Sequence, residues 1–233
     1  MNLKLTFLAI IMGSYSYSAA QLKCGIKIGL TESKIKENIA NSSQDMRFKS
    51  GCLFGGFINM PVRKNFVLRS GLQLTQKGFE AVEGNPQGPF YWYRKWSMSY
   101  LELPIDFVYH LPFSNSVNLY IGFGPVCGIG LFGKGKAIVK ATDGNGQSYT
   151  EESHGNKPFK HPGFKKVDIG ADFLTGIRVK RLELTAGYNL GVINALNYEE
   201  NIQNTKHRSF SISLGFLLHR QTSPPPNRKW VCS

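Results

Sequence analysis

Between residues 100 and 111 the chain alternates apolar and polar side chains almost without a break. Leu101 and Leu103 share one face of this segment, whereas Glu102 and Asp106 share the other. Successive side chains of a β-strand point to opposite sides, whereas a helix would mix these two sets. The segment is therefore predicted to be a strand with one apolar and one polar face.

The same alternation recurs along the chain and predicts eight strands. They cover residues 22–30, 47–59, 66–76, 100–111, 117–123, 167–179, 182–190 and 210–218. Apart from isolated charges, their polar faces hold mainly Gly, Ser, Thr and Asn. A water-facing exterior is rich in Lys and Glu, whereas small side chains suit the narrow lumen of an eight-stranded barrel. The apolar faces are therefore expected to point outward into lipid.

The predicted connections alternate between short and long. Short links fall near residues 61–64, 112–116 and 180–181, and long ones span 31–46, 79–95, 133–166 and 191–206. Outer-membrane barrels combine short periplasmic turns with longer external loops. We therefore expect an all-β fold, an eight-stranded antiparallel up-and-down transmembrane β-barrel in the outer membrane of a Gram-negative bacterium, with both termini periplasmic.

The two ends of the chain differ from the middle. Residues 1–20 begin with a basic Lys4, continue through an apolar stretch and end in small residues up to Ala20, which is typical of a secretory signal peptide. Residues 221–233 contain Pro224, Pro225 and Pro226 in a row, which cannot join a sheet ladder. The predicted division is a signal peptide at 1–20, a barrel at 21–220 and a short periplasmic tail at 221–233.

Charge and cysteine content restrict the partners. A net charge of +13 suits nucleic acid, acidic glycans or a phosphate-rich membrane surface, and export argues against nucleic acid. Cys24, Cys52, Cys127 and Cys232 are widely scattered and form no metal-type pair. Their even number permits disulfides, but unpaired thiols are the favoured interpretation.

Several charged residues fall on the polar faces of the predicted strands and should line the lumen. A buried ion without a partner costs several kcal/mol, so these residues are expected to pair. Our hypothesis is an ionic network that plugs the barrel; the alternative is a gated ion path through the same charges. The residues are Arg69, Glu102, Asp106, Asp168, Asp172, Arg178 and Glu183.

The long segment 133–166 is predicted to be a basic external loop. Either it attracts lipopolysaccharide phosphates or acidic glycans, or it is simply a solvated, mobile loop. An Asp-Gly-Asn-Gly turn signal lies at residues 143–146. The basic residues of the loop are Lys134, Lys136, Lys140, Lys157, Lys160, Lys165 and Lys166.

Aromatic residues near the predicted strand ends suggest two interfacial belts, because amphipathic rings prefer the headgroup level. Trp92 and Trp96 would lie at the outer interface, and Tyr109 and Tyr120 at the inner one. The alternative is that these rings pack a loop against the barrel rim.

No residue pattern indicates catalysis. His154 and His161 lie near Ser153 and Glu151, but no motif frames them. We therefore expect no catalytic residue, no metal ligand set, no cofactor and no enzymatic activity.

Four short segments resemble a known family. They are Gly-Ile-Lys-Ile-Gly at 25–29, Leu-Gln-Leu-Thr-Gln-Lys-Gly at 72–78, Tyr-Leu-Glu-Leu-Pro at 100–104 and Ile-Gly-Phe-Gly-Pro at 121–125. Together they make the chain similar to the porin-family, PorT-like outer-membrane β-barrel domains common in Bacteroidota. The resemblance implies an OmpX- or OmpA-like barrel and brings no activity with it.

The functional expectation is a structural or loop-mediated binding role in the cell envelope. The alternatives are a narrow pore for ions or small solutes and a soluble lipocalin-like carrier, which would turn its apolar faces inward. Expected partners are outer-membrane lipid, with lipopolysaccharide as a candidate, and the barrel-assembly machinery. The protein is expected to be a monomer that binds no nucleic acid.

Overall fold

The computed structural model describes residues 22–36, 45–85, 87–114, 116–142, 147–160, 163–195 and 205–218. Within these ranges no helix is long and apolar enough to cross a membrane. The strands are β1 (Lys23–Lys36), β2 (Asp45–Arg47), β3 (Lys49–Arg63), β4 (Phe66–Gly84), β5 (Phe90–Pro112), β6 (Val117–Thr142), β7 (Ser148–Gly155), β8 (Val167–Val179), β9 (Leu182–Gly191) and β10 (Lys206–Leu217). The predicted signal peptide and tail lie outside the described residues.

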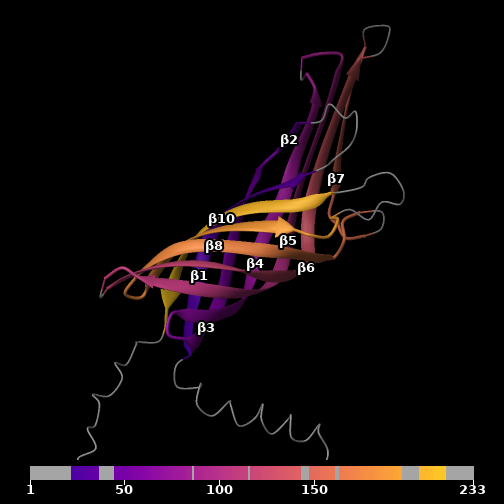
Figure 1. Ribbon diagram of the computed structural model, residues 1–233. Coiled ribbons are helices and arrows are strands. Elements are labelled where there is room, and N and C mark those ends of the chain that lie inside the picture. The colour runs from indigo at the N-terminus through magenta and orange to yellow at the C-terminus, as the bar shows by residue number, and fades with distance from the viewer. Residues whose placement is uncertain are drawn as a thin grey trace, which may run out of the picture.

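Eight of these strands close into a ring in the order β1, β3, β4, β5, β6, β8, β9 and β10. Every neighbouring pair is antiparallel, and β1 closes the ring by pairing with β10 from Gly25 opposite Leu217 to Lys36 opposite Lys206. The predicted all-β, eight-stranded antiparallel barrel is therefore confirmed (Figure 1).

The outside of the ring is apolar. On β5, Leu103 and Phe107 are 45% and 56% exposed, whereas Glu102 and Asp106 are 3% and 2% exposed. The other ring strands repeat this pattern, with exposed Ile28, Phe54, Leu72, Ile121, Phe173, Leu184 and Ile212 among others. The predicted orientation is confirmed, and it contradicts the lipocalin-like alternative, which requires these side chains inside.

Three ring strands run well past the others, so the predicted loops at 79–95 and 133–166 are largely wrong. Residues 77–84 of β4, 90–99 of β5 and 130–142 of β6 continue as strand, and β2 and β7 add to their edges. We call this extension the projecting sheet; its strand order is β2, β4, β5, β6 and β7, and it rises from one side of the barrel (Figure 1). In residues 90–96 of β5, aromatic and cationic side chains lie on both faces, so no apolar-polar alternation marked this part of the sheet.

A bulge in β6 marks the base of the projecting sheet. Tyr100 pairs with Gly130 but Ser99 pairs with Phe132, which leaves Leu131 without a partner in the register. One extra residue reverses which side chains face inward. Lys134 and Lys136 therefore lie on the same side as the apolar outer wall.

The two described ends of the chain meet at the opposite end of the barrel. Leu218 N donates to Cys24 O at 2.9 Å. The tight connection at Lys180, which has a φ of 55°, and the link between β3 and β4 lie at this same end. The barrel thus has one end with short turns and one end with the projecting sheet.

Candidate functional site: the barrel lumen

A first ionic group lies in the half of the lumen near the short turns. Arg69 of β4 and Arg178 of β8 both bind the Glu183 carboxylate of β9; Arg69 Nη2 reaches Oε2 at 2.9 Å and Arg178 Nε donates to Oε1 at 2.6 Å. Glu183 is 1% exposed. Two guanidinium groups from separate strands therefore share one buried carboxylate, which ties β4, β8 and β9 together across the lumen.

Aromatic rings enclose Arg69. Its Cζ lies 4.9 Å from the Phe57 ring centre and 5.0 Å from that of Tyr120, and its Nε donates to Asn59 Oδ1 at 2.8 Å. Cation–π contacts of this kind strengthen when water is excluded. Arg69 is thus held on several sides within the lumen.

A second ionic group lies farther toward the projecting sheet and centres on Lys77. Lys77 Nζ contacts Glu102 Oε1 at 2.6 Å and Asp168 Oδ2 at 2.8 Å. Gln73 and Thr75 donate to the other oxygen of Glu102 at 2.8 and 2.7 Å. Lys77 is 2% exposed, so its charge is balanced by carboxylates rather than by water.

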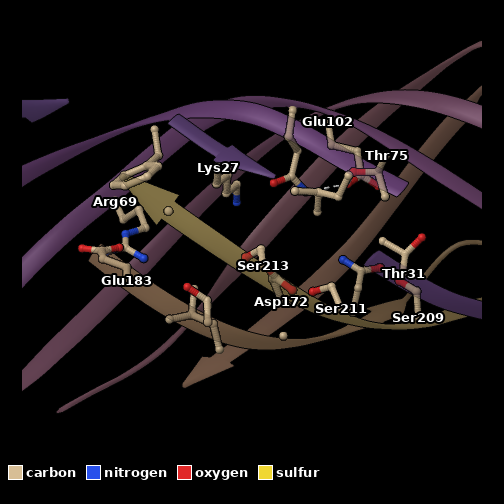
Figure 2. Close-up of a pocket in the computed structure, with 18 residues that line it drawn as sticks. Lys27, Thr31, Arg69, Thr75, Glu102, Asp172, Glu183, Ser209, Ser211 and Ser213 are labelled. Atoms are coloured by element: carbon tan, nitrogen blue, oxygen red, sulfur yellow. Dashed lines mark hydrogen bonds and ion pairs between the residues drawn. The ribbon is translucent and has the colours of Figure 1, made fainter. Parts of the chain in front are cut away.

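Between the two groups lies a small cavity of about 40 Å³, measured as the space open to the centres of water-sized spheres. It has room for on the order of three water molecules. Figure 2 shows Arg69 with Glu183 at one end and Glu102 with Thr75 at the other, with Lys27 and Asp172 between them. Small residues form much of the remaining wall, next to larger ones such as Leu53 and Leu174; the small ones are Thr31, Thr185, Gly187, Ser209, Ser211, Ser213 and Gly215.

Apolar side chains close the lumen on the side of the projecting sheet. The members of this mouth cluster are Ile35, Phe79, Ala81, Met98, Tyr100, Phe164 and Ala195, with Met46, Trp92, Trp96 and Phe159 packed against them. Tyr100 connects the cluster to the ionic layer, because its ring lies 5.7 Å from Lys77 Nζ and 5.6 Å from the Phe159 ring. Phe159 and Phe164 come from the connection between β7 and β8, which therefore covers the mouth.

Five of the seven predicted lumen residues belong to the two ionic groups, and two belong to neither. The structure brings Arg69, Arg178 and Glu183 into one group, and it joins Glu102 to Asp168 only through Lys77. Asp106 and Asp172 belong to neither group. Asp106 Oδ1 is buried without a hydrogen-bond partner in the described part of the chain, and Asp172 lines the cavity.

Sequence reasoning missed Lys77, the centre of the second group. The predicted strand ended at Gln76, yet Lys77 continues the inward series of Arg69, Gln73 and Thr75. Extending the alternation by one residue would have placed it in the lumen. Lys27, which is not among the residues of the predicted network, also lines the cavity.

The predicted aromatic belts need correction. Tyr120 is fully buried, and its hydroxyl lies 2.6 Å from Thr185 Oγ1 inside the lumen, because alternation along β6 turns it inward. Trp92 and Trp96 lie on the inner side of the projecting sheet and pack on the mouth cluster, with Trp96 edge-on to Phe164 at 5.5 Å. Only Tyr109 faces outward, where its ring packs on Phe66 at 4.8 Å.

The predicted basic loop is also divided. Lys134, Lys136 and Lys140 lie on β6 within the projecting sheet, whereas Lys157, Lys160, Lys165 and Lys166 lie in the connection that leads to β8. Lys136 contacts Glu152 of β7 at 2.5 Å, and His154 Nε2 lies 3.3 Å from the same carboxylate oxygen. The expected turn at 143–146 and His161 lie outside the described residues.

In the part of the chain that the structure describes, the cysteines are unpaired and no group of side chains could hold a metal ion. Cys24, Cys52 and Cys127 are free thiols exposed on the outer face, as predicted for them, whereas Cys232 lies outside the described residues. No three His, Cys, Asp or Glu side chains among these residues are close enough to hold a metal ion.

A closed antiparallel ring with an apolar outer wall and an ion-paired interior defines a small outer-membrane β-barrel protein. The sequence agrees with this class. The model of the outer membrane protein β-barrel domain family matches residues 16–197, and the chain belongs to that family.

Solved structures to which the chain is similar include those of three bacterial proteins. Ail, the attachment invasion locus protein of Yersinia pestis, is 15% identical, with 84% of this chain and 98% of that one covered and a TM-score of 0.38. Neisserial surface protein A is 15% identical over 83% and 96% of the two chains, with a TM-score of 0.39. OprG of Pseudomonas aeruginosa is 13% identical over 84% and 96%, with a TM-score of 0.40. The sequence has no match among curated proteins.

Proposed function

We propose that this protein is a non-conducting barrel that anchors the projecting sheet outside the cell, where the sheet binds a macromolecular partner. The proposal depends above all on one observation: β4, β5 and β6 run without interruption from the ring into the projecting sheet. A sheet continuous with a closed barrel is held far more rigidly than a loop. Rigid presentation lowers the entropy that binding must overcome.

The lumen supports a non-conducting barrel. Two ionic groups and the mouth cluster occupy successive levels, and the space between them has room only for a few waters. A narrow pore would require these paired charges to separate. Breaking a buried ion pair costs several kcal/mol, so open states would be rare.

The two unlike barrel ends support the orientation. Short turns and both described ends of the chain lie together at the end opposite the projecting sheet. Outer-membrane barrels keep short turns in the periplasm. We infer that the projecting sheet is extracellular and that both termini are periplasmic.

Epitope tags on intact cells test this orientation. A tag inserted after Gly88, in the turn between β4 and β5, should bind antibody without permeabilisation. A matched tag after Lys180, at the opposite end, should bind only after the outer membrane is opened. The reverse pattern would overturn the proposal.

Planar-bilayer recording tests the closed lumen. Purified barrel should show no reproducible steady conductance. A variant altered at all three levels, with Arg69, Lys77, Glu183, Phe159 and Phe164 replaced by Ala, should conduct if its heat-dependent gel mobility shows that it remains folded. Steady conductance of the unaltered protein would instead favour the pore alternative.

Truncation of the projecting sheet tests whether it binds the partner. Removing only the part of the projecting sheet that extends past the mouth cluster should abolish partner binding, and heat-dependent gel mobility checks that the shortened barrel still folds. The finer assignment to the PorT-like group of Bacteroidota stays a prediction that depends on the four sequence segments.

A further inference from the structure

Two cations face each other on the outer wall of the barrel, where the ring closes. Lys34 of β1 stands directly opposite Arg208 of β10 in the strand register. Their neighbours Ser33 and Ser209 are 0% and 5% exposed and point inward, so alternation turns Lys34 and Arg208 outward.

No described carboxylate neutralises this pair. Like charges directly opposite one another on a sheet are destabilising, yet neither Lys34 nor Arg208 forms an ion pair with a described Asp or Glu. The nearest acidic side chain in the register is Glu32, which is exposed and accepts a hydrogen bond from Ser50 Oγ at 2.5 Å. Arg208 Nε is inaccessible to water and has no hydrogen-bond partner in the described part of the chain.

The surroundings of the pair suit the boundary between hydrocarbon and headgroups. Lys34 Nζ lies 4.5 Å above the Phe48 ring, and Phe48 and Tyr188 both pack on Phe210, at 6.4 and 4.7 Å between ring centres. Toward the short turns, the exposed apolar wall begins at Phe210 on β10 and, beyond Glu32, at Leu30 on β1. Of these rings, that of Tyr188 is amphipathic and of the kind that collects at headgroup level, so the two cations would meet lipid phosphates.

We propose that Lys34 and Arg208 form a binding site for the phosphate of a membrane lipid, with Phe48 and Phe210 supporting the headgroup and the apolar wall contacting its acyl chains. The phosphate places negative charge between two cations that otherwise repel each other. In the orientation proposed above, this lipid belongs to the outer leaflet, but the site is independent of any partner of the projecting sheet.

Bound lipid can be counted directly by native mass spectrometry. The full-length mature chain is refolded in phosphatidylcholine vesicles that contain phosphatidate as a minor component, then released in mild detergent. We expect phosphatidate to remain on the unaltered protein. Lys34→Gln combined with Arg208→Gln should weaken its retention by at least about tenfold, the change expected from losing one charge-assisted hydrogen bond, whereas Arg208→Lys should keep most of it.

The controls separate this site from general attraction and from free anions. Lys140→Gln with Lys157→Gln removes the same charge far from the apolar wall and should leave retention unchanged; an equal loss there would overturn the proposal. Equal retention by the Lys34 and Arg208 double variant would also overturn it. If inorganic phosphate displaces the lipid at similar concentration, the site binds a free anion and the lipid assignment is wrong.

Discussion

Lys77 and Asp168 are separated by 91 positions in the sequence, yet their charged groups meet at 2.8 Å inside the barrel. The same ammonium group contacts Glu102. Lys77→Met should therefore leave two buried carboxylates without a cation and destabilise the barrel by about 3–5 kcal/mol. Urea unfolding in phospholipid vesicles measures this. The exposed Lys140→Met is the control, and an equal effect of both changes would contradict the role of Lys77.

Glu183→Gln tests the other ionic group. The change would leave the guanidinium groups of Arg69 and Arg178 close together without their shared carboxylate, and we expect a loss of similar size, about 3–5 kcal/mol. Replacing Arg178 by Met in the same protein removes one of the two repelling cations and should recover part of the loss. Additive losses in the double variant would show that the three side chains do not act as a unit.

Gly135→Ala should disturb the mouth cluster. A Cβ at this position would lie 2.6 Å from the Trp96 ring, whereas a Cβ on Gly56 would meet only a backbone oxygen at 3.6 Å. Overpacking of this kind costs about 1–3 kcal/mol. The Gly135 variant should shift the tryptophan emission and lower the unfolding midpoint, and Gly56→Ala should change the emission little.

The native thiols report which surface faces lipid. With Cys232 replaced by Ser, the remaining Cys24, Cys52 and Cys127 should react slowly with a charged maleimide when the barrel is in vesicles. Unfolding in urea should make all three react fast. Rapid labelling of Cys127 in folded, vesicle-bound protein would place water where the fold places hydrocarbon.

Glu152 of the projecting sheet gives a pH-dependent contact. The hydrogen bond from Lys136, with a smaller contribution from nearby positive charge, lowers the pKa of the Glu152 carboxyl below its usual value. A lowered pKa means that the contact is complete above the pKa of the unfolded chain and is lost as pH falls through the folded value. Carboxylate NMR should show this titration, and Lys136→Gln should return the pKa toward the ordinary range.

The strand alternation was sufficient to predict the ring, because lipid on one side and a packed lumen on the other demand opposite side chains. The same alternation did not predict the strands of the projecting sheet. Residues 90–96 carry rings and charges on both faces, since each face there can meet water or protein, and the segment resembled a loop. Tyr120 was wrongly predicted to lie at the membrane interface because it is a tyrosine, although the alternation along its strand placed it inward.

The charges of the lumen were largely predictable, but their partners were not. The alternation of side chains along each strand places Arg69 and Glu183 inside, but it does not show how far each strand is shifted along its neighbour. That shift decides which side chains meet across the lumen. Asp106 is inward as expected and lies directly opposite Arg69 in the register, yet the Arg69 side chain binds Glu183 and Asn59 instead.

The ring closes between its first strand and its last, since β1 pairs with β10. A chain that is delivered N-terminus first therefore has one unpaired edge on β1 until β10 has also been delivered. During that interval Arg69 has no Glu183, and its positive charge opposes early entry into the bilayer. Insertion of this protein is thus tied to completion of its polypeptide, because the backbone groups on that edge of β1 have no partner strand before β10 arrives.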